Sequence, residues 1–176
     1  PPVILRKGIC LRGGFAGAGD FSAPDPAAHA SVIKGTARAA AVDLDASSVT
    51  VEGFTLTGGK RGIDFPGWEA IHDIRIAGNV IEKNGDAKDG DQNGGGIAFH
   101  GTRVAIVDNV IRGNVAGNRG AAIARNGAAV DFRIEGNHIA DNIGYGDHAG
   151  GIYLDGTGLL ARNLIEGNRC CEGTGY

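Results

Sequence analysis

The sequence predicts an all-β fold, a single-stranded parallel β-helix of about six to seven coils, each lying on the one before. Three observations predict it: a segment that recurs every 26 to 30 residues, short alternating apolar runs within each copy, and asparagines at fixed positions. Alternation over four to six residues indicates a strand, and no long stretch keeps the period of a helix. A repeat of this length fits one coil of a β-helix better than a propeller blade of about 40–45 residues.

The recurring segment combines an apolar run with two asparagines five residues apart. It occurs at residues 76–84, 107–114, 134–142 and 161–168, and an earlier copy at 51–59 has the apolar pattern without the asparagines. A second signature, a glycine- or alanine-rich turn followed by isoleucine, comes after each of these copies but the last. It occurs at Gly94–Ile97, Gly120–Ile123 and Ala149–Ile152, and in weaker form at Arg61–Ile63. Each coil is therefore expected to contain several short strands separated by tight turns.

Eight of the eleven asparagines form the repeated pairs. Asparagine tolerates the left-handed backbone of tight turns, and its amide can bond to the same amide one coil away. We therefore expect a structural role for them, as two ladders. The first would contain Asn79, Asn109, Asn137 and Asn163, and the second Asn84, Asn114, Asn142 and Asn168.

One domain is expected over residues 1–176, as a fragment of a longer chain. Residues 1–46 predict irregular N-terminal coils with a loop at 15–30, and residues 47–176 predict regular coils. Neither end shows the polar cap or capping helix that repeat arrays need. We therefore expect end-to-end contact with the rest of the chain or with another copy.

The charge and the apolar pattern exclude two kinds of partner. Seventeen basic and twenty acidic residues give a net charge of −3, without the basic surplus that favours nucleic acid. No apolar run approaches the ~18 residues of a membrane-spanning helix, so we expect no membrane insertion.

The repeats resemble those of right-handed parallel β-helix proteins. The resemblance is carried by the Ile-x-x-Asn segments, such as Ile76–Asn79, and by the Gly-Gly-Ile turns that alternate with them; Ile4–Phe15 and Ser31–Gly35 look like early coils. This group includes pectate-lyase-like enzymes, phage tailspikes and polymorphic outer-membrane adhesins. The resemblance implies a right-handed parallel β-helix. It implies little about function, because the shared residues belong to the scaffold.

Aligning the copies on their strand isoleucines predicts one polar face. The first position after the isoleucine holds Asp64, Ala98, Ala124 and Tyr153, and the third holds Pro66, His100, Asn126 and Asp155. Both positions should point outward, with steps of about 4.8 Å. His100, Asn126 and Asp155 would then form a column along which a sugar chain could lie, with His100 or Asp155 as acid, base or hydrogen-bonding group. The alternative is a solvated strand end.

Arg125 falls in an inward column that is otherwise apolar. A buried guanidinium without a partner is costly, so either a bulge turns it outward or it pairs with Asp131 or Asp155. We favour the bulge, and a role in neutralising an anionic sugar. The turns before the Gly-Gly-Ile strands should rim the same face with charged residues, namely Lys60, Arg61, Asp89, Asp91, Arg119, Asp147 and His148.

The longest of these turns suggests a calcium site. Asp89-Gly-Asp91-Gln-Asn93-Gly94 matches the first half of an EF-hand loop, in which oxygens at alternate positions wrap a hard cation. The match then fails, because the twelfth position holds His100 instead of glutamate and no helices flank the loop. Calcium at Asp89, Asp91 and Asn93 is thus weighed against a turn whose carboxylates are solvated.

Two functions stay open. The first is an extracellular or cell-surface β-helix that interacts with polysaccharide, leaning towards a lyase on acidic polysaccharide, which needs a base and a cation. Its catalytic candidates are His100, Arg125, Asp155 and Arg119, and its substrate-binding candidates are Lys60, Asp64, Asn126, His148 and Tyr153. The second is a non-catalytic adhesin, surface or structural module that binds a cell-surface glycan. Charges gathered on one face would favour the enzyme, and an even spread would favour the module.

Hydrolysis requires a different pair of acids from those on this face. Asp64 and Asp155 should lie three coils apart, about 14 Å by strand spacing. This exceeds the ~5–9.5 Å that separates the two carboxyl groups of a glycosidase. A hydrolase would need another pair, for example Asp155 with Asp147.

Overall fold

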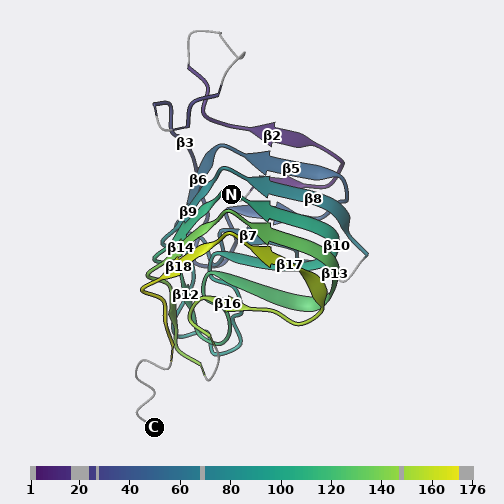
Figure 1. Ribbon diagram of the computed structural model, residues 1–176. Helices are drawn as coiled ribbons and strands as arrows, with labels where there is room; N and C mark the ends of the chain where they lie inside the picture. Colours follow the sequence, from purple (N-terminus) through teal and green to yellow (C-terminus); the bar gives the residue numbers. More distant parts are fainter. Residues whose placement is uncertain (1–2, 17–23, 27, 68–69, 147–148, 171–176) are drawn as a thin grey trace.

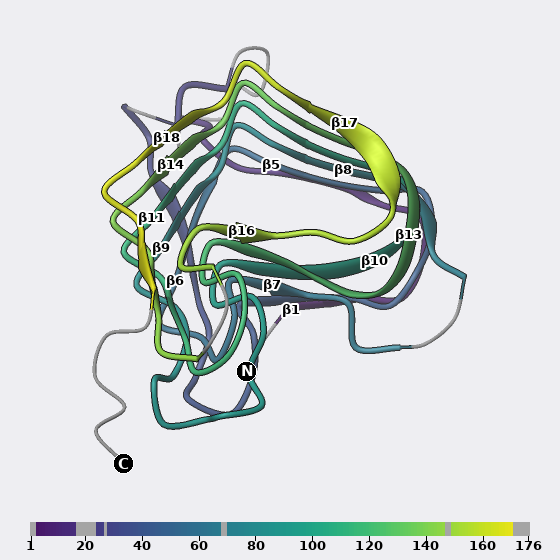
Figure 2. The ribbon, with the colours of Figure 1, turned by 60° about the horizontal axis from the view of Figure 1, so that its bottom comes forward.

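The computed structural model describes residues 3–16, 24–26, 28–67, 70–146 and 149–170. Within these ranges the chain is a parallel β-solenoid without a helix, which confirms the predicted fold class. The coils stack from β2 at one end to β17 at the other (Figure 1). Viewed closer to the solenoid axis, the coils superimpose and their strands form three main faces (Figure 2).

We number the faces in chain order. The first face contains β1 (Val3–Leu5), β4 (Val42–Leu44), β7 (Ile63–Asp64), the beginnings of β10 (Ile97–Val107) and β13 (Ile123–Glu135), and β16 (Ile152–Tyr153). The second contains β2 (Cys10–Arg12), β5 (Val49–Glu52), β8 (His72–Ala77), the ends of β10 and β13, and β17 (Thr157–Ala161). The third contains β3 (Ser31–Lys34), β6 (Phe54–Thr57), β9 (Val80–Glu82), β11 (Val110–Arg112), β14 (His138–Ala140) and β18 (Leu164–Glu166). A short sheet after the third face holds β12 (Val115–Ala116), β15 (Ile143–Gly144) and β19 (Arg169–Cys170).

The first two faces form one ten-stranded sheet, because β10 and β13 continue around the corner between them. Every strand pair between these named strands is parallel, as expected when each strand pairs with its copy in the next coil.

The number of coils differs from the prediction. About four regular turns are present, counted from β4 through β7, β10 and β13 to β16, so the expectation of about six to seven coils is wrong. The two ends account for the difference. Strands β1–β3 and β17–β19 extend the sheets but lie outside this set of regular turns.

The core consists of inward columns of aliphatic side chains. On the third face Leu56, Ile81, Ile111, Ile139 and Ile165 occupy one register position in successive turns. The first four are fully buried, whereas Ile165 in the last turn is 48% exposed. Full burial of such a side chain contributes roughly 1.5–3 kcal/mol, so the column stabilises the regular turns more than the last one.

Both predicted asparagine ladders are present. In the first, the side-chain amide of Asn79 donates to Asn109 Oδ1 at 3.1 Å, Asn109 donates to Asn137 at 3.0 Å, and Asn137 donates to Asn163 at 2.9 Å. The second ladder repeats this pattern from Asn84 through Asn114 and Asn142 to Asn168. The ladders occupy the corners on either side of the third face, where each is preceded by a left-handed residue such as Gly78 (φ 59°) or Asp108 (φ 54°).

A search of the described residues finds no helix that is long and apolar enough to span a membrane.

Candidate functional site

The outward side of the first face carries the candidate site. One register position holds Asp43, Asp64, Ala98, Ala124 and Tyr153 in successive turns. Ala98 and Ala124 are almost completely buried although they lie on the outer side of the strands. The neighbouring turns therefore cover the middle of the face and leave charged groups towards its two ends.

Paired charges occupy the end formed by the earlier turns. Arg61 Nη1 lies 2.9 Å from Asp64 Oδ2, and Arg61 Nε donates to the backbone oxygen of Asn93 at 2.9 Å. Lys60 Nζ lies 2.8 Å from Asp89 Oδ2. The hydrogen bond from Lys60 is the main cause that lowers the pKa of Asp89. Both cations are thus engaged with carboxylates of the protein itself.

Asp43 is a site residue that the alignment of the repeats does not include. It pairs in register with Asp64, so the two carboxyl groups occupy adjacent strands, about 4.8 Å apart by strand spacing. Burial raises the pKa of Asp43, the nearby charge of Asp64 raises it further, and Arg61 opposes the shift. The signal was the shared pattern of an aliphatic residue followed by aspartate, Val42-Asp43 and Ile63-Asp64.

At the end formed by the later turns, Arg119 and Tyr153 lie together. The guanidinium carbon of Arg119 is 4.9 Å from the centroid of the Tyr153 ring, and Nη1 donates to Tyr153 Oη at 3.1 Å. The backbone N–H of Arg119 donates to Asn93 Oδ1 at 3.2 Å, which ties this turn to the preceding one. The stacked pair is a cation–π contact that combines a fixed positive charge with an aromatic surface.

Arg125 lies close by and pairs with Asp155. Its Nη1 is 3.0 Å from Asp155 Oδ2; the Arg125 side chain is 12% exposed and the Asp155 side chain 81%. Directly after Arg125, β13 contains two residues more than the segment of β10 opposite it, because Phe99 pairs with Arg125 and Gly101 with Ala129. The bulge and the pairing with Asp155 thus occur together, and Asp131 is not the partner in this ion pair.

His100 is not exposed as predicted. It is 7% exposed, and its ring packs edge-on against Phe65 at 5.7 Å between centroids. The register shift after Phe99 places it within the bent part of β10. His100 therefore does not belong to the exposed column that was predicted for His100, Asn126 and Asp155. The side chain of Asn126 lies outside the part of the chain that the structure describes.

The turn with the calcium-like motif is held by contacts to the solenoid. Asp89 accepts from Lys60 and from the backbone N–H of Asp91, and Asn93 accepts from Arg119. Gln92, which is 1% exposed, accepts from the Asp86 backbone at 2.7 Å and donates to the Lys60 carbonyl. Among the described residues no group of three or more His, Cys, Asp or Glu could hold a metal ion. Calcium stays a prediction, and His148 and Asp147 lie outside the described residues.

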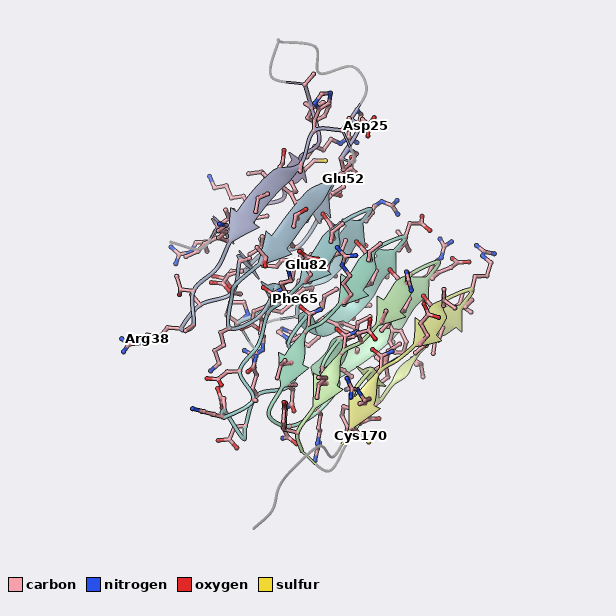
Figure 3. All side chains as sticks on the ribbon, turned by 90° about the vertical axis from the view of Figure 1, so that its left-hand side faces the viewer. Asp25, Arg38, Glu52, Phe65, Glu82 and Cys170 are labelled. Atoms are coloured by element: carbon pink, nitrogen blue, oxygen red, sulfur yellow. The ribbon has the colours of Figure 1, made fainter. Side chains whose placement is uncertain are left out.

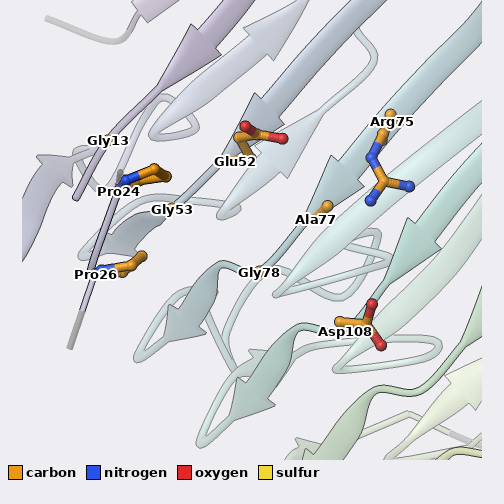
Figure 4. Close-up of a pocket in the computed structure, with 9 residues that line it drawn as sticks. All are labelled: Gly13, Pro24, Pro26, Glu52, Gly53, Arg75, Ala77, Gly78 and Asp108. Atoms are coloured by element: carbon orange, nitrogen blue, oxygen red, sulfur yellow. The ribbon is translucent and has the colours of Figure 1, made fainter. Parts of the chain in front are cut away.

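A shallow pocket of about 240 Å³ lies at the corner between the second and third faces. Figure 4 shows Glu52, Arg75 and Asp108 from successive turns at one side and Pro24 and Pro26 at the other. None of the predicted site residues lines it, so it is separate from the first-face site.

Charged side chains are also spread over the other faces. Glu82 pairs with Arg112 on the third face, and Asp73 pairs with Arg103 at 2.6 and 2.9 Å at the start of the second. Figure 3 shows side chains of this kind along the length of the stack. Charge pairs are therefore not confined to the first face.

Comparison with protein-family models, with curated proteins and with solved structures finds no match. The parallel β-solenoid is therefore established by the structure, whereas the resemblance to pectate-lyase-like proteins is not confirmed by any relative.

Proposed function

We propose that this chain is an extracellular or cell-surface β-solenoid that binds acidic polysaccharide on its first face. The observation that carries the proposal is the stack of Arg119 on Tyr153 beside the Arg125–Asp155 pair. An aromatic ring offers a surface to the apolar face of a sugar, and a guanidinium can bind a carboxylate through two parallel hydrogen bonds. A uronic acid residue presents both groups.

The exposure of Asp155 supports an exchange of partners at Arg125. Its carboxylate is largely in solvent while the guanidinium that it contacts is mostly covered. Losing Asp155 alone would leave the covered guanidinium without a counter-charge, which is costly, so a group that replaces Asp155 must itself be an anion such as a sugar carboxylate. The geometry therefore favours binding of an anion over a purely structural ion pair.

Calorimetric titration with uronic acid oligosaccharides tests the proposal. We expect Arg119→Ala to weaken binding by about tenfold or more, because it removes both the cation and the support of the Tyr153 ring. Arg112→Ala is the matched control, since Arg112 is an exposed arginine paired with a glutamate on the third face. Added salt should weaken binding to the wild type.

Any of three results would contradict the proposal. One is the absence of binding to every acidic oligosaccharide. Another is an equal loss of affinity in the Arg112 and Arg119 variants, which would place the anion elsewhere. Retained binding of neutral analogues in which the carboxylates are reduced would also argue against recognition of acidic sugars.

A catalytic function is a second candidate, and Asp43 with Asp64 supports it. The pKa of Asp43 is raised, whereas Asp64 is paired with Arg61. Two neighbouring carboxyl groups in such different environments can act as acid and base in one reaction. Adjacent strands lie about 4.8 Å apart, so two carboxyl groups that point the same way from paired positions can reach the ~5–5.5 Å separation of a retaining glycosidase. The lyase-like alternative would instead draw its cationic groups from Arg119 and Arg125.

Product analysis separates these chemistries. Hydrolysis creates reducing ends alone, whereas elimination also creates an unsaturated sugar that absorbs ultraviolet light. Hydrolysis lost in both Asp43→Asn and Asp64→Asn, with oligosaccharide binding retained, would support the carboxylate pair. No cleavage by the wild type, with or without added calcium, would leave the non-catalytic adhesin or surface module.

A further inference from the structure

Large exposed apolar side chains gather at the two ends of the described solenoid. Ile4, Ile9 and Val32 belong to the first turn, and Leu159, Leu160, Leu164 and Ile165 belong to the last. Each is 45–54% exposed, and Val130 is the remaining member of this class among the described residues. Single exposed apolar residues are ordinary, but contiguous ones mark interaction surfaces.

The register of the strands indicates which side chains could pack on the last turn. On the third face Ile33 pairs with Leu56, and the same column continues through Ile81, Ile111 and Ile139 to Ile165. If the first turn of a second copy follows the last turn in the same register, its Ile33 lies beside Ile165. The apolar column then continues without a break.

The other positions match in the same register. Inward, Leu160 meets Leu11 on the second face, and Ile152 meets Val3 on the first. Outward on the third face, Leu164 meets Val32, and these two side chains are 54% and 52% exposed.

A charge pair completes the third-face match. Glu166 ends β18 and Lys34 ends β3 at equivalent positions, so the glutamate of one copy, which lies 2.8 Å from His138 Nε2 on its own preceding strand, would face the lysine of the next on its other side. Opposite charges on adjacent strands stabilise a pair, and like charges disfavour it.

We propose that the chain associates head to tail with second copies of itself, the β1–β3 end of one on the β16–β18 end of another. The edges of β3 and β18 would then pair as parallel strands, which satisfies backbone groups that a sheet edge leaves open. A head-to-tail contact that continues the solenoid along its own axis leaves a free end at every step, so the assembly is a linear filament. Pro24 and Pro26 line the corner pocket with Gly53 and Gly78, so this part of the 15–30 excursion lies beside the stack.

Sedimentation velocity over a concentration series tests the proposal with the 176-residue chain. We expect reversible association that Glu166→Lys or Lys34→Glu each weakens by about tenfold, because each places like charges in contact. The double variant Glu166→Lys with Lys34→Glu restores opposite charges and should recover association. Lys88→Glu is the matched control for the lysine change, since Lys88 is exposed in the turn between β9 and β10 (residues 84–94), away from both ends.

A second variant covers loss of the apolar contact. Leu164→Lys should give a monomer that melts at the wild-type temperature, because this side chain is already half exposed in the single chain. A wild-type monomer at all concentrations would overturn the proposal. Association that is weakened by Glu166→Lys and not by Lys34→Glu would also overturn it, because this would indicate contact between two like ends. Failure of the double variant to restore association would overturn it as well.

Discussion

At the scale of single residues, the ladder asparagines explain how tight corners are buried. Asn109 Oδ1 accepts from both the backbone and the side chain of Asn79, and its Nδ2 donates to Ile76, Val107 and Asn137. One side chain therefore satisfies polar groups that the turn would otherwise leave without partners. A buried polar group without a hydrogen bond costs about 1–3 kcal/mol, which is why one residue type recurs at this position.

Asn109→Ala should therefore lower the free energy of unfolding by roughly 3 kcal/mol. Asn163→Ala removes the same amide from the last turn, where water reaches it, and should cost about 1 kcal/mol. Urea denaturation measures both. Asn118→Ala, outside the ladders, is the control and should stay within about 0.5 kcal/mol of the wild type. Equal losses at Asn109 and Asn163 would contradict the buried-ladder account.

Two aspartates should give opposite dependences of stability on pH. Burial and Asp64 raise the pKa of Asp43 above 3.8, whereas the hydrogen bonds from Arg103 lower the pKa of Asp73 below 3.8. Asp43 therefore favours folding at pH below 3.8, and this contribution is lost as pH rises through its folded pKa. Asp73 contributes above pH 3.8, and its contribution is lost as pH falls below that value.

Urea denaturation of Asp43→Asn and Asp73→Asn between pH 3 and 7 tests these signs. Relative to the wild type, Asp43→Asn should become more stable as pH rises, and Asp73→Asn should become less stable. Two curves with the same sign of slope would show that one of the two environments is misassigned.

At the scale of elements, the 84–94 turn illustrates how backbone contacts decide a conformation. Gly85 has φ of 106° and donates to the Gly59 carbonyl at 2.9 Å, and an added Cβ would overlap the Val115 carbonyl. Gly90 in the same turn has open space around it. We expect Gly85→Ala to cost about 3 kcal/mol or more, and Gly90→Ala to be nearly neutral. Thermal unfolding checks the pair, and comparable melting temperatures would refute the close approach.

The same scale shows what the sequence could predict. Strands and ladders were predictable because each turn repeats them. Asn109 and Asn137, for example, occupy the same position in successive copies of the repeat. His100 is buried against Phe65, and Arg125 pairs with Asp155. Each of these is a single contact between turns that does not recur along the chain, so the repeat pattern cannot predict it. The sequence does not predict Asp43 as a site residue because residues 1–46 are expected to form irregular coils, although β4 stacks in register on β7.

At the scale of the whole molecule, stability should vary along the stack. Each turn contacts mainly its neighbours, so the free energy resembles a sum of terms for turns and for the interfaces between them. A middle turn has two such interfaces, and an end turn has one. The exposures agree, since Ile106 and Ile111 are fully buried while Leu160 in the last turn is 49% exposed.

Native-state hydrogen exchange should therefore show protection that falls from the middle of the stack to its ends. Backbone amides of β10 and β11 should exchange most slowly, and those of β17 and β18 faster, because the last turn can open without breaking a second interface. Head-to-tail association would add the missing interface, so higher protein concentration should slow exchange in β1, β3, β17 and β18 and leave β10 unchanged. Uniform protection at low concentration would contradict the expected gradient, because it would mean that the solenoid unfolds as one cooperative unit.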